Sequence, residues 1–260
     1  MILTLLSDFG LSDVYVAVMK GTIAQINPTL TMIDLTHQVP PQDIAAARFH
    51  LMNAYPYFPA GTVHIAVVDP SVGSLRRAIA IQLESGFLVA PDNGLVSGVL
   101  SQNSAIAAVE LTNPFYWRTS SPSTTFHGRD IFAPIGAHLA SGVPIRELGT
   151  EIGLRTIIHL PIANPTCIGN TIWGVIQAID HFGNLITNIS GDEVAGKSWS
   201  VSLENSTYPS KSTYSDSEPG EILALVGSHG WVEIAASRDN AQRQLNLKWG
   251  SAISVVMDGT

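Results

Sequence analysis

The stretch ILTLLSDFG, residues 2–10, joins a short apolar run directly to a polar turn that ends in glycine. A run of this length before a turn is typical of a buried strand. Ser12 can then cap a helix over residues 14–26, which Pro28 ends. A β-branched run follows at residues 31–35. Strand, helix and strand in this order predict a mainly parallel sheet that is covered by helices.

The same alternation continues to about residue 160. A helix is predicted over residues 42–55, and a largely apolar strand follows over residues 62–68. Two further apolar runs within residues 78–90 predict a hairpin. Residues 127–141 contain another helix, which we expect to begin after Pro134.

The pattern changes around residues 162–169. From there on, short strands are predicted at residues 173–179, 185–189, 199–203, 222–226, 231–235 and 252–256. Short strands separated by Gly, Asn and Ser turns are typical of a small barrel or sandwich. The sequence therefore predicts two domains, an α/β domain at residues 1–163 and a smaller all-β domain at residues 170–260.

The composition limits the classes of partner. The chain has 260 residues, of which 45% are hydrophobic and 13% charged, so it can bury a sizeable core. Its net charge of -8 is opposite in sign to the basic face that a nucleic-acid partner requires. The sequence contains no uninterrupted apolar run of about 20 residues, so no membrane span is predicted. The first residues lack the basic region of a secretion signal, so we expect a cytoplasmic protein.

Cysteine and histidine usage argues against disulfides and metal sites. The single cysteine, Cys167, has no partner for an internal disulfide. We interpret it as a small buried hydrophobic residue and not as a nucleophile. The eight histidines show no metal-ligand spacing, so no metal site is predicted.

Polar residues follow three of the predicted strands in the first domain. Asp8, Asp69 and Asp92 each come just after an apolar run. In open α/β sheets, ligands bind beyond the carboxyl ends of the strands. No Gly-x-Gly-x-x-Gly or Walker sequence follows any strand, which disfavours dinucleotides and P-loop triphosphates. Asp8 is placed to accept two hydrogen bonds from vicinal ribose hydroxyls, although an aspartate that only forms a turn is equally common there.

Arginine and histidine accompany Asp69. Adjacent side chains on an extended segment point to opposite faces, so one of Arg76 and Arg77 can face the Asp69 cleft while the other faces solvent. A surface arginine pair is the alternative. His127 stands beside a glycine before a helix, where a structural role is also common. Aspartate, arginine and histidine together can hold and polarise a water molecule.

The all-β domain offers one polar turn of interest. Asp180, Phe182 and Asn184 surround a single glycine. These groups suit an adenine ring or a charged amine, although an ordinary turn often has the same composition.

Several segments together resemble a known family. They are Ser7-Asp8-Phe9-Gly10 with Asp13 and Lys20-Gly21; Pro40-Pro41-Gln42-Asp43-Ile44; Val68-Asp69-Pro70 to Arg76-Arg77; Ala90-Pro91-Asp92-Asn93-Gly94-Leu95; Thr125-Phe126-His127-Gly128-Arg129-Asp130; Asp180 to Asn188; and Glu218-Pro219-Gly220-Glu221 with Gly227-Ser228. In this order they resemble the S-adenosylmethionine hydroxide adenosyltransferases, relatives of the S-adenosylmethionine-dependent fluorinase and chlorinase. The match extends over nearly the whole chain.

The resemblance implies both a fold and a site. It implies a three-layer α/β domain followed by a β-barrel domain, and a homotrimer with sites between neighbouring subunits. The residues that match the family's site are Asp69, Arg76 and His127 for the water, Asp8 for the ribose, Asp180 for the methionine amino group, Phe182 and Asn184 for adenine, and Ser228 for the methionine carboxylate. The chain departs from the pattern at Ala17 and Ser71, at His229 and Trp231, and over residues 236–240.

The implied reaction is attack of water or hydroxide on the ribose C5′ carbon of S-adenosylmethionine, which releases adenosine and L-methionine without a metal or other cofactor. A 5′-halogenase and a non-catalytic sensor are the alternatives. Asp69 stands where the family's halogenases have an uncharged residue, and Gly128 stands where the fluorinase has a hydroxyl donor. Residues 78–90 lack the long insertion of the fluorinase. These differences favour water as the nucleophile.

Overall fold

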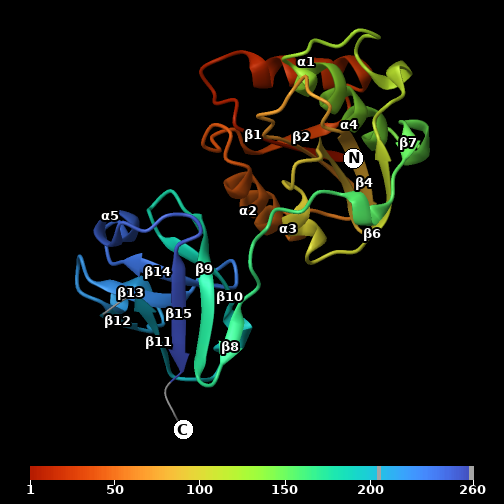
Figure 1. Ribbon diagram of the computed structural model, residues 1–260. Coiled ribbons are helices and arrows are strands. Elements are labelled where there is room, and N and C mark those ends of the chain that lie inside the picture. The colour runs from red at the N-terminus through yellow and green to blue at the C-terminus, as the bar shows by residue number, and fades with distance from the viewer. Residues whose placement is uncertain (204–205, 258–260) are drawn as a thin grey trace. The chain divides into compact units, whose positions relative to one another are not determined.

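The computed structural model describes residues 1–203 and 206–257. The chain divides into two compact units, Met1–Leu160 and Pro161–Thr260 (Figure 1). None of the helices in the described residues is long and apolar enough to cross a membrane.

The first unit is built on a seven-stranded mixed sheet with strand order β2-β1-β3-β5-β4-β6-β7. The strands are β1 (Ile2–Ser7), β2 (Thr31–Thr36), β3 (Thr62–Val67), β4 (Ala78–Leu83), β5 (Gly86–Pro91), β6 (Ala105–Glu110) and β7 (Thr150–Glu151). β2, β1, β3 and β5 are parallel neighbours, whereas β4 and β5 form the predicted hairpin and β6 and β7 continue in antiparallel pairing. The carboxyl ends of β1 and β3 therefore lie side by side.

Helices cover both faces of this sheet (Figure 1). They are α1 (Tyr15–Ile26) and α4 (Ala133–Ala140) on one face, and α2 (Ile44–Ala54) and α3 (Ser97–Leu100) on the other. Successive strand residues alternate between the two cores: Ile65 packs with α1 and α4, and Ala66 packs with α2 and α3. Strands that are apolar on both faces are typical of sheets buried between helices. The predicted three-layer α/β architecture is confirmed.

Two helix starts differ from the prediction. α1 begins at Tyr15 with Val14 at its N-cap and without a side-chain cap, so Ser12 does not cap it. The last predicted helix begins before Pro134, as a π-helical turn, Gly128–Phe132, that runs directly into α4. Pro134 lies in the first turn of α4 and has no N–H to donate to the carbonyl of Asp130, four residues earlier; that carbonyl accepts instead from the N–H of Arg118 at 3.0 Å.

The second unit is an antiparallel, nearly closed sheet with strand order β12-β11-β15-β9-β10-β14-β13, and β8 pairs with β9. The strands are β8 (Thr166–Ile168), β9 (Thr171–Ile179), β10 (Leu185–Ser190), β11 (Trp199–Leu203), β12 (Ser206–Pro209), β13 (Ile222–Val226), β14 (Trp231–Ala236) and β15 (Ala252–Met257). Just after β12, the N–H of Lys211 donates to the carbonyl of Ala224 in β13, which brings the two ends of the sheet together. The predicted β-barrel is confirmed.

The prediction missed the short elements of this unit. β8, β12 and the helix α5 (Ala241–Leu245) were not expected, because three to five residues carry too little periodicity. Cys167 lies in β8 and is exposed, so its interpretation as a buried residue is wrong. Short 3₁₀ turns complete the structure at Tyr55–Tyr57, Pro114–Tyr116, Ile145–Glu147, Leu154–Thr156, Gly191–Glu193 and Tyr214–Asp216.

Candidate active site

A cavity of about 420 Å³ lies at the carboxyl ends of β1 and β3. It is lined by Asp8, Phe9, Tyr15, Gln42, Val67, Asp69, Pro70, Val72, Thr125, Phe126, His127 and Gly128. Three predicted site residues, Asp8, Asp69 and His127, thus share one cavity at the sheet edge where an α/β fold binds its ligands.

The backbone around Gln42 orients Asp8. The backbone N–H of Gln42 donates to Oδ2 of Asp8 at 2.8 Å. Gln42 has a φ of 67°, a conformation that costs a non-glycine residue free energy and that is concentrated at functional sites. Oδ1 of Asp8 makes no hydrogen bond among the described residues and is left to accept one from a ligand.

Arg76 joins two side chains of this cavity. Its Nε donates to Oδ1 and Oδ2 of Asp69 at 3.0 and 2.9 Å, and its Nη2 donates to Oδ2 at 2.5 Å. The same Nη2 lies 2.7 Å from Nδ1 of His127. The side chains of Arg76 and Asp69 are only 8% and 6% exposed. The structure therefore brings the predicted triad together, with Arg76 behind the two cavity-lining groups; the roles of the three residues stay a prediction.

The contact with Arg76 decides the protonation of His127. An arginine N–H can only donate, so Nδ1 of the imidazole is the acceptor and is unprotonated. Burial, and then the charge of Arg76, lowers the pKa of His127. His127 is therefore neutral at pH 7 with its proton on Nε2. The positive charge of the cluster belongs to Arg76.

The loop after β3, which carries Arg76, packs closely against the loop that precedes His127. Gly73 has a φ of +79°, and a Cβ there would overlap the carbonyl oxygen of Thr124. Only glycine allows the loop that carries Arg76 to touch the loop that precedes His127. The hydroxyl of Ser71 lies 3.5 Å from Oδ1 of Asp69.

Asp130 holds the segment that carries His127. It is fully buried and accepts hydrogen bonds from Nε of Arg118 at 2.5 Å and Nε of Arg129 at 2.7 Å. The N–H of Ser123 donates to its second oxygen at 2.8 Å. Burial alone would raise the pKa of this carboxyl, but the hydrogen bonds from Arg129 and Arg118 lower it well below its usual range. An ionised Asp130 thus fixes the chain on both sides of His127.

One of the two arginines was predicted to face solvent, but Arg77 does not. Its side chain is 26% exposed and donates through Nε to Asp92 at 2.8 Å and through Nη1 to Oγ1 of Thr156 at 3.0 Å. Asp92 is 1% exposed and accepts a further bond from the N–H of Ile158 at 2.8 Å. The two arginines do point to opposite faces, but Arg77 and Asp92 tie the 154–158 segment to the sheet and do not line the cavity.

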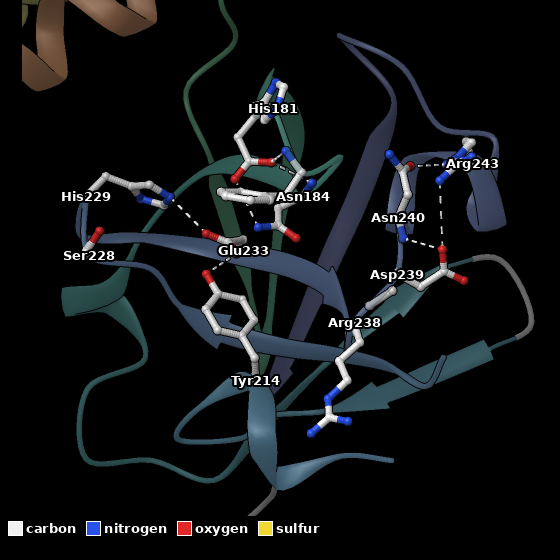
Figure 2. A pocket seen from close by; sticks show the side chains of 13 residues that line it. His181, Asn184, Tyr214, Ser228, His229, Glu233, Arg238, Asp239, Asn240 and Arg243 are labelled. Carbon is white, nitrogen blue, oxygen red and sulfur yellow. Dashed lines mark hydrogen bonds and ion pairs between the residues drawn. The ribbon is translucent and has the colours of Figure 1, made fainter. Parts of the chain in front are cut away.

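A second cavity, of about 720 Å³, lies in the β-barrel unit (Figure 2). Four predicted binding residues line it: Asp180, Phe182, Asn184 and Ser228. Phe182 is 71% exposed, so its ring is open to stacking on a flat ligand. Each set of predicted residues is thus assembled within its own unit.

The turn between β9 and β10 is built around Asp180. Its Oδ1 accepts from the N–H groups of Phe182 and Asn184 at 2.9 and 2.8 Å, and its Oδ2 accepts from Nδ2 of Asn184 at 2.9 Å. Gly183 has a φ of +85°, and a Cβ there would overlap the side chain of Asn240. Asn240 therefore packs against this turn.

Sequence reasoning missed several lining residues. Gln42 was noticed only as part of a family segment, and its left-handed φ has no sequence signal beyond the two prolines before it. Tyr214 and Glu233 line the second cavity and were not considered. Among the described residues, no group of three or more His, Cys, Asp and Glu side chains is arranged to hold a metal ion.

Family models match both units. The SAM hydroxide adenosyltransferase N-terminal domain matches residues 3–149, and the SAM hydroxide adenosyltransferase C-terminal domain matches residues 174–254. The chain belongs to the SAM hydroxide adenosyltransferase family. A solved structure of a conserved protein from Thermotoga maritima has the same fold, with a TM-score of 0.90 and 33% identity, matched over 98% of this chain and 100% of that one.

Proteins similar to this chain carry two activities in their names. The "(R)-S-adenosyl-L-methionine hydrolase" of Salinispora tropica is 40% identical over 96% of this chain and 95% of that protein. The protein of the same name from Thermus thermophilus is 38% identical over 96% and 98%. The fluorinase of an Actinoplanes species is more distant, at 28% identity over 98% and 97%.

Proposed function

We propose that this chain hydrolyses S-adenosyl-L-methionine to adenosine and L-methionine. One observation carries the proposal: Asp69, Arg76 and His127 form one hydrogen-bonded cluster on the cavity that also contains Asp8. The names of the relatives at 38–40% identity support the same reaction. The more distant fluorinases make halogenation the second candidate.

The main task of the site is to position and activate the nucleophile, because the leaving group departs without help. The leaving group is a sulfonium that departs as a neutral thioether, so it needs neither a general acid nor a metal. The water oxygen forms a bond to C5′ as the C5′–sulfur bond breaks, and one proton is released. Asp69 is the anionic acceptor for a water hydrogen, and the Nε2–H of neutral His127 is the remaining donor of the cluster. Arg76 keeps both groups in place, and positioning alone lowers a barrier by several kcal/mol.

The two cavities account for different parts of the substrate. Asp8 accepts from the ribose hydroxyls, and Phe182 and Asn184 contact adenine. Asp180 holds the methionine amino group and Ser228 the carboxylate. We further propose a homotrimer in which sites are shared between subunits. A single cysteine without a disulfide partner is compatible with the reducing cytoplasm, where we place the enzyme.

Asp69 favours water over a halide. A carboxylate accepts a hydrogen bond from water but repels an anion, and like charges a few ångströms apart cost about 1 kcal/mol even in high dielectric. The hairpin of β4 and β5 is short, since only residues 84 and 85 separate the two strands. A non-catalytic sensor would not require the buried Asp69–Arg76 pair beside the cavity.

The test is a reaction in oxygen-18 water with concentrated chloride, followed by mass spectrometry of the nucleoside. Heavy oxygen at the 5′ position of adenosine supports the proposal. If the main product is 5′-chloro-5′-deoxyadenosine, the proposal is refuted. Binding of S-adenosylmethionine without any product would indicate a sensor. Asp69→Asn should abolish most turnover, whereas Asp192→Asn, the same substitution at an exposed position outside both cavities, should not.

A further inference from the structure

Glu233 is a buried carboxylate that has no role in the reaction or in the substrate contacts proposed above. It lies on β14, where Val232 and Ile234 face the barrel core. The alternation of a strand puts Glu233 on the opposite face, where charged residues are usually exposed. Its side chain is nevertheless only 3% exposed, and it lines the cavity that also contains Asp180 and Ser228.

Two neutral donors hold this carboxylate in place (Figure 2). The hydroxyl of Tyr214 donates to Oε1 at 2.8 Å, and Nε2 of His229 lies 3.0 Å from Oε2. The N–H of Trp231 donates to Nδ1 of His229 at 3.2 Å, so the imidazole proton is on Nε2 and the ring is neutral. Burial, followed by the hydrogen bond to Glu233, raises the pKa of Tyr214, and the charge of Asp180 raises it further. Tyr214 therefore remains a donor and lies within the field of both carboxylates.

The charges on this side of the cavity are unbalanced. Among the described residues, no lysine or arginine nitrogen lies within 4.0 Å of a carboxylate oxygen of Glu233 or of Asp180. Arg243 is beside Asp239 and Asn240, across the cavity from Glu233, and Arg238 extends away from both (Figure 2). Buried charges in proteins are paired, since an unpaired one loses hydration without compensation. A cation is missing from this side.

We propose that the ligand supplies this cation, and that Glu233 is a second anionic contact for the substrate's α-amino group, beside Asp180. This inference rests on the proposed function, because that function assigns an amino-acid chain to the cavity. Tyr214 and His229 are positioning residues, since they hold the carboxylate without adding charge. Glu233 thereby becomes a specificity-determining residue that selects substrates with a protonated amine.

The experiment measures binding of stable ligands to the full chain in the presence of adenosine. L-Methionine carries the amine and the carboxylate, 3-(methylthio)propylamine carries only the amine, and 4-(methylthio)butanoate carries only the carboxylate. Glu233→Gln keeps the shape and removes the charge. We expect roughly 10- to 100-fold weaker binding of the two amines by calorimetry, the effect of one charge-assisted hydrogen bond, and little change for the butanoate. Asp192→Asn is the control for loss of one negative charge from the same unit.

A purely structural Glu233 would change all three affinities by the same factor, and that outcome overturns the inference. So does unchanged binding of the amines. If Glu233→Gln does not fold, Glu233→Asp keeps the charge but withdraws it by one methylene, and the same amine-dependent loss is expected in smaller size. These measurements need no turnover. If the protein binds amines through Glu233 but does not hydrolyse S-adenosylmethionine, the proposed function alone is refuted. If the enzyme is active but the Glu233 variants bind the amines unchanged, only this inference is refuted.

Discussion

The adjacent arginines Arg76 and Arg77 each belong to a buried ion pair, but only Arg76 should be needed for activity. In Arg77→Ala, Asp92 keeps only the backbone N–H of Ile158 as a donor, although it is 1% exposed. Removing one partner of a buried ion pair costs about 3–5 kcal/mol. Water reaches the Arg77 side chain, which is 26% exposed, so we expect a loss at or below the lower end of this range, about 2–3 kcal/mol. For a unit of this size, that lowers Tm by roughly 5–10 °C.

Arg76→Ala also breaks a buried ion pair, with Asp69, so it should lower stability as well, but unlike Arg77→Ala it should act on the reaction. It removes every arginine contact to Asp69 and the donor to Nδ1 of His127, so kcat should fall by about 100-fold or more. Arg77→Ala should keep kcat at 25 °C within about threefold, because its contacts lie outside the cavity. Scanning calorimetry and chromatographic detection of adenosine measure the two effects. Equal rate losses in both variants, or an unchanged Tm in Arg77→Ala, would refute this reasoning.

Three further predictions follow from the two units. Asp8→Ala should weaken adenosine binding by about 1.5–3 kcal/mol for each lost ribose hydrogen bond, and calorimetry showing unchanged affinity removes Asp8 from the site. If sites are shared between subunits, mixing inactive Asp69→Ala and inactive Asn184→Ala chains should restore part of the activity, and no recovery after verified subunit exchange counts against sharing. Burial lowers the pKa of His64 to about 4, below the 6.5 of an unfolded histidine, so stability should decrease by about 3 kcal/mol as the pH falls from 6.5 to 4. Urea unfolding at both pH values checks this, and His64→Gln should remove most of the difference.

Long periodic elements were predictable from sequence and short ones were not. Most strands of both units carry enough apolar residues to identify them, although β6 was not predicted. The two-sided burial of β3 follows from its sequence, in which Thr62 and His64 are the polar residues. His64 is compatible with that burial because Nδ1 of its ring lies 2.8 Å from the hydroxyl of Thr4. β8 and α5 depend on tertiary pairing, which no local pattern of three to five residues reveals.

The site was predictable where a family motif names the residue. Sequence spacing alone left open which of two arginines faces Asp69, and the family match selected Arg76. Glu233 escaped notice because an acidic residue at an outward strand position reads as solvated. Its burial depends on Tyr214, which lies 19 residues earlier in a polar loop. Contacts of this kind are set by how loops cover a strand, and this information is absent from the pattern of the strand itself.

The neutral state of His127 gives the reaction a characteristic acid limb. Nδ1 of the imidazole accepts from Arg76, and burial and the arginine charge lower its pKa. Its folded pKa lies below 6.5, so the hydrogen bond persists through neutral pH and is lost only when the ring is protonated in acid. We expect kcat/KM to be flat from pH 8 down to about 6.5 and to fall below it. In His127→Asn, the side-chain oxygen can accept from Arg76 but does not titrate, so this limb should move to lower pH or vanish even if the rate at pH 8 is reduced. A midpoint above 6.5, or an unchanged limb in His127→Asn, would show that another group controls it.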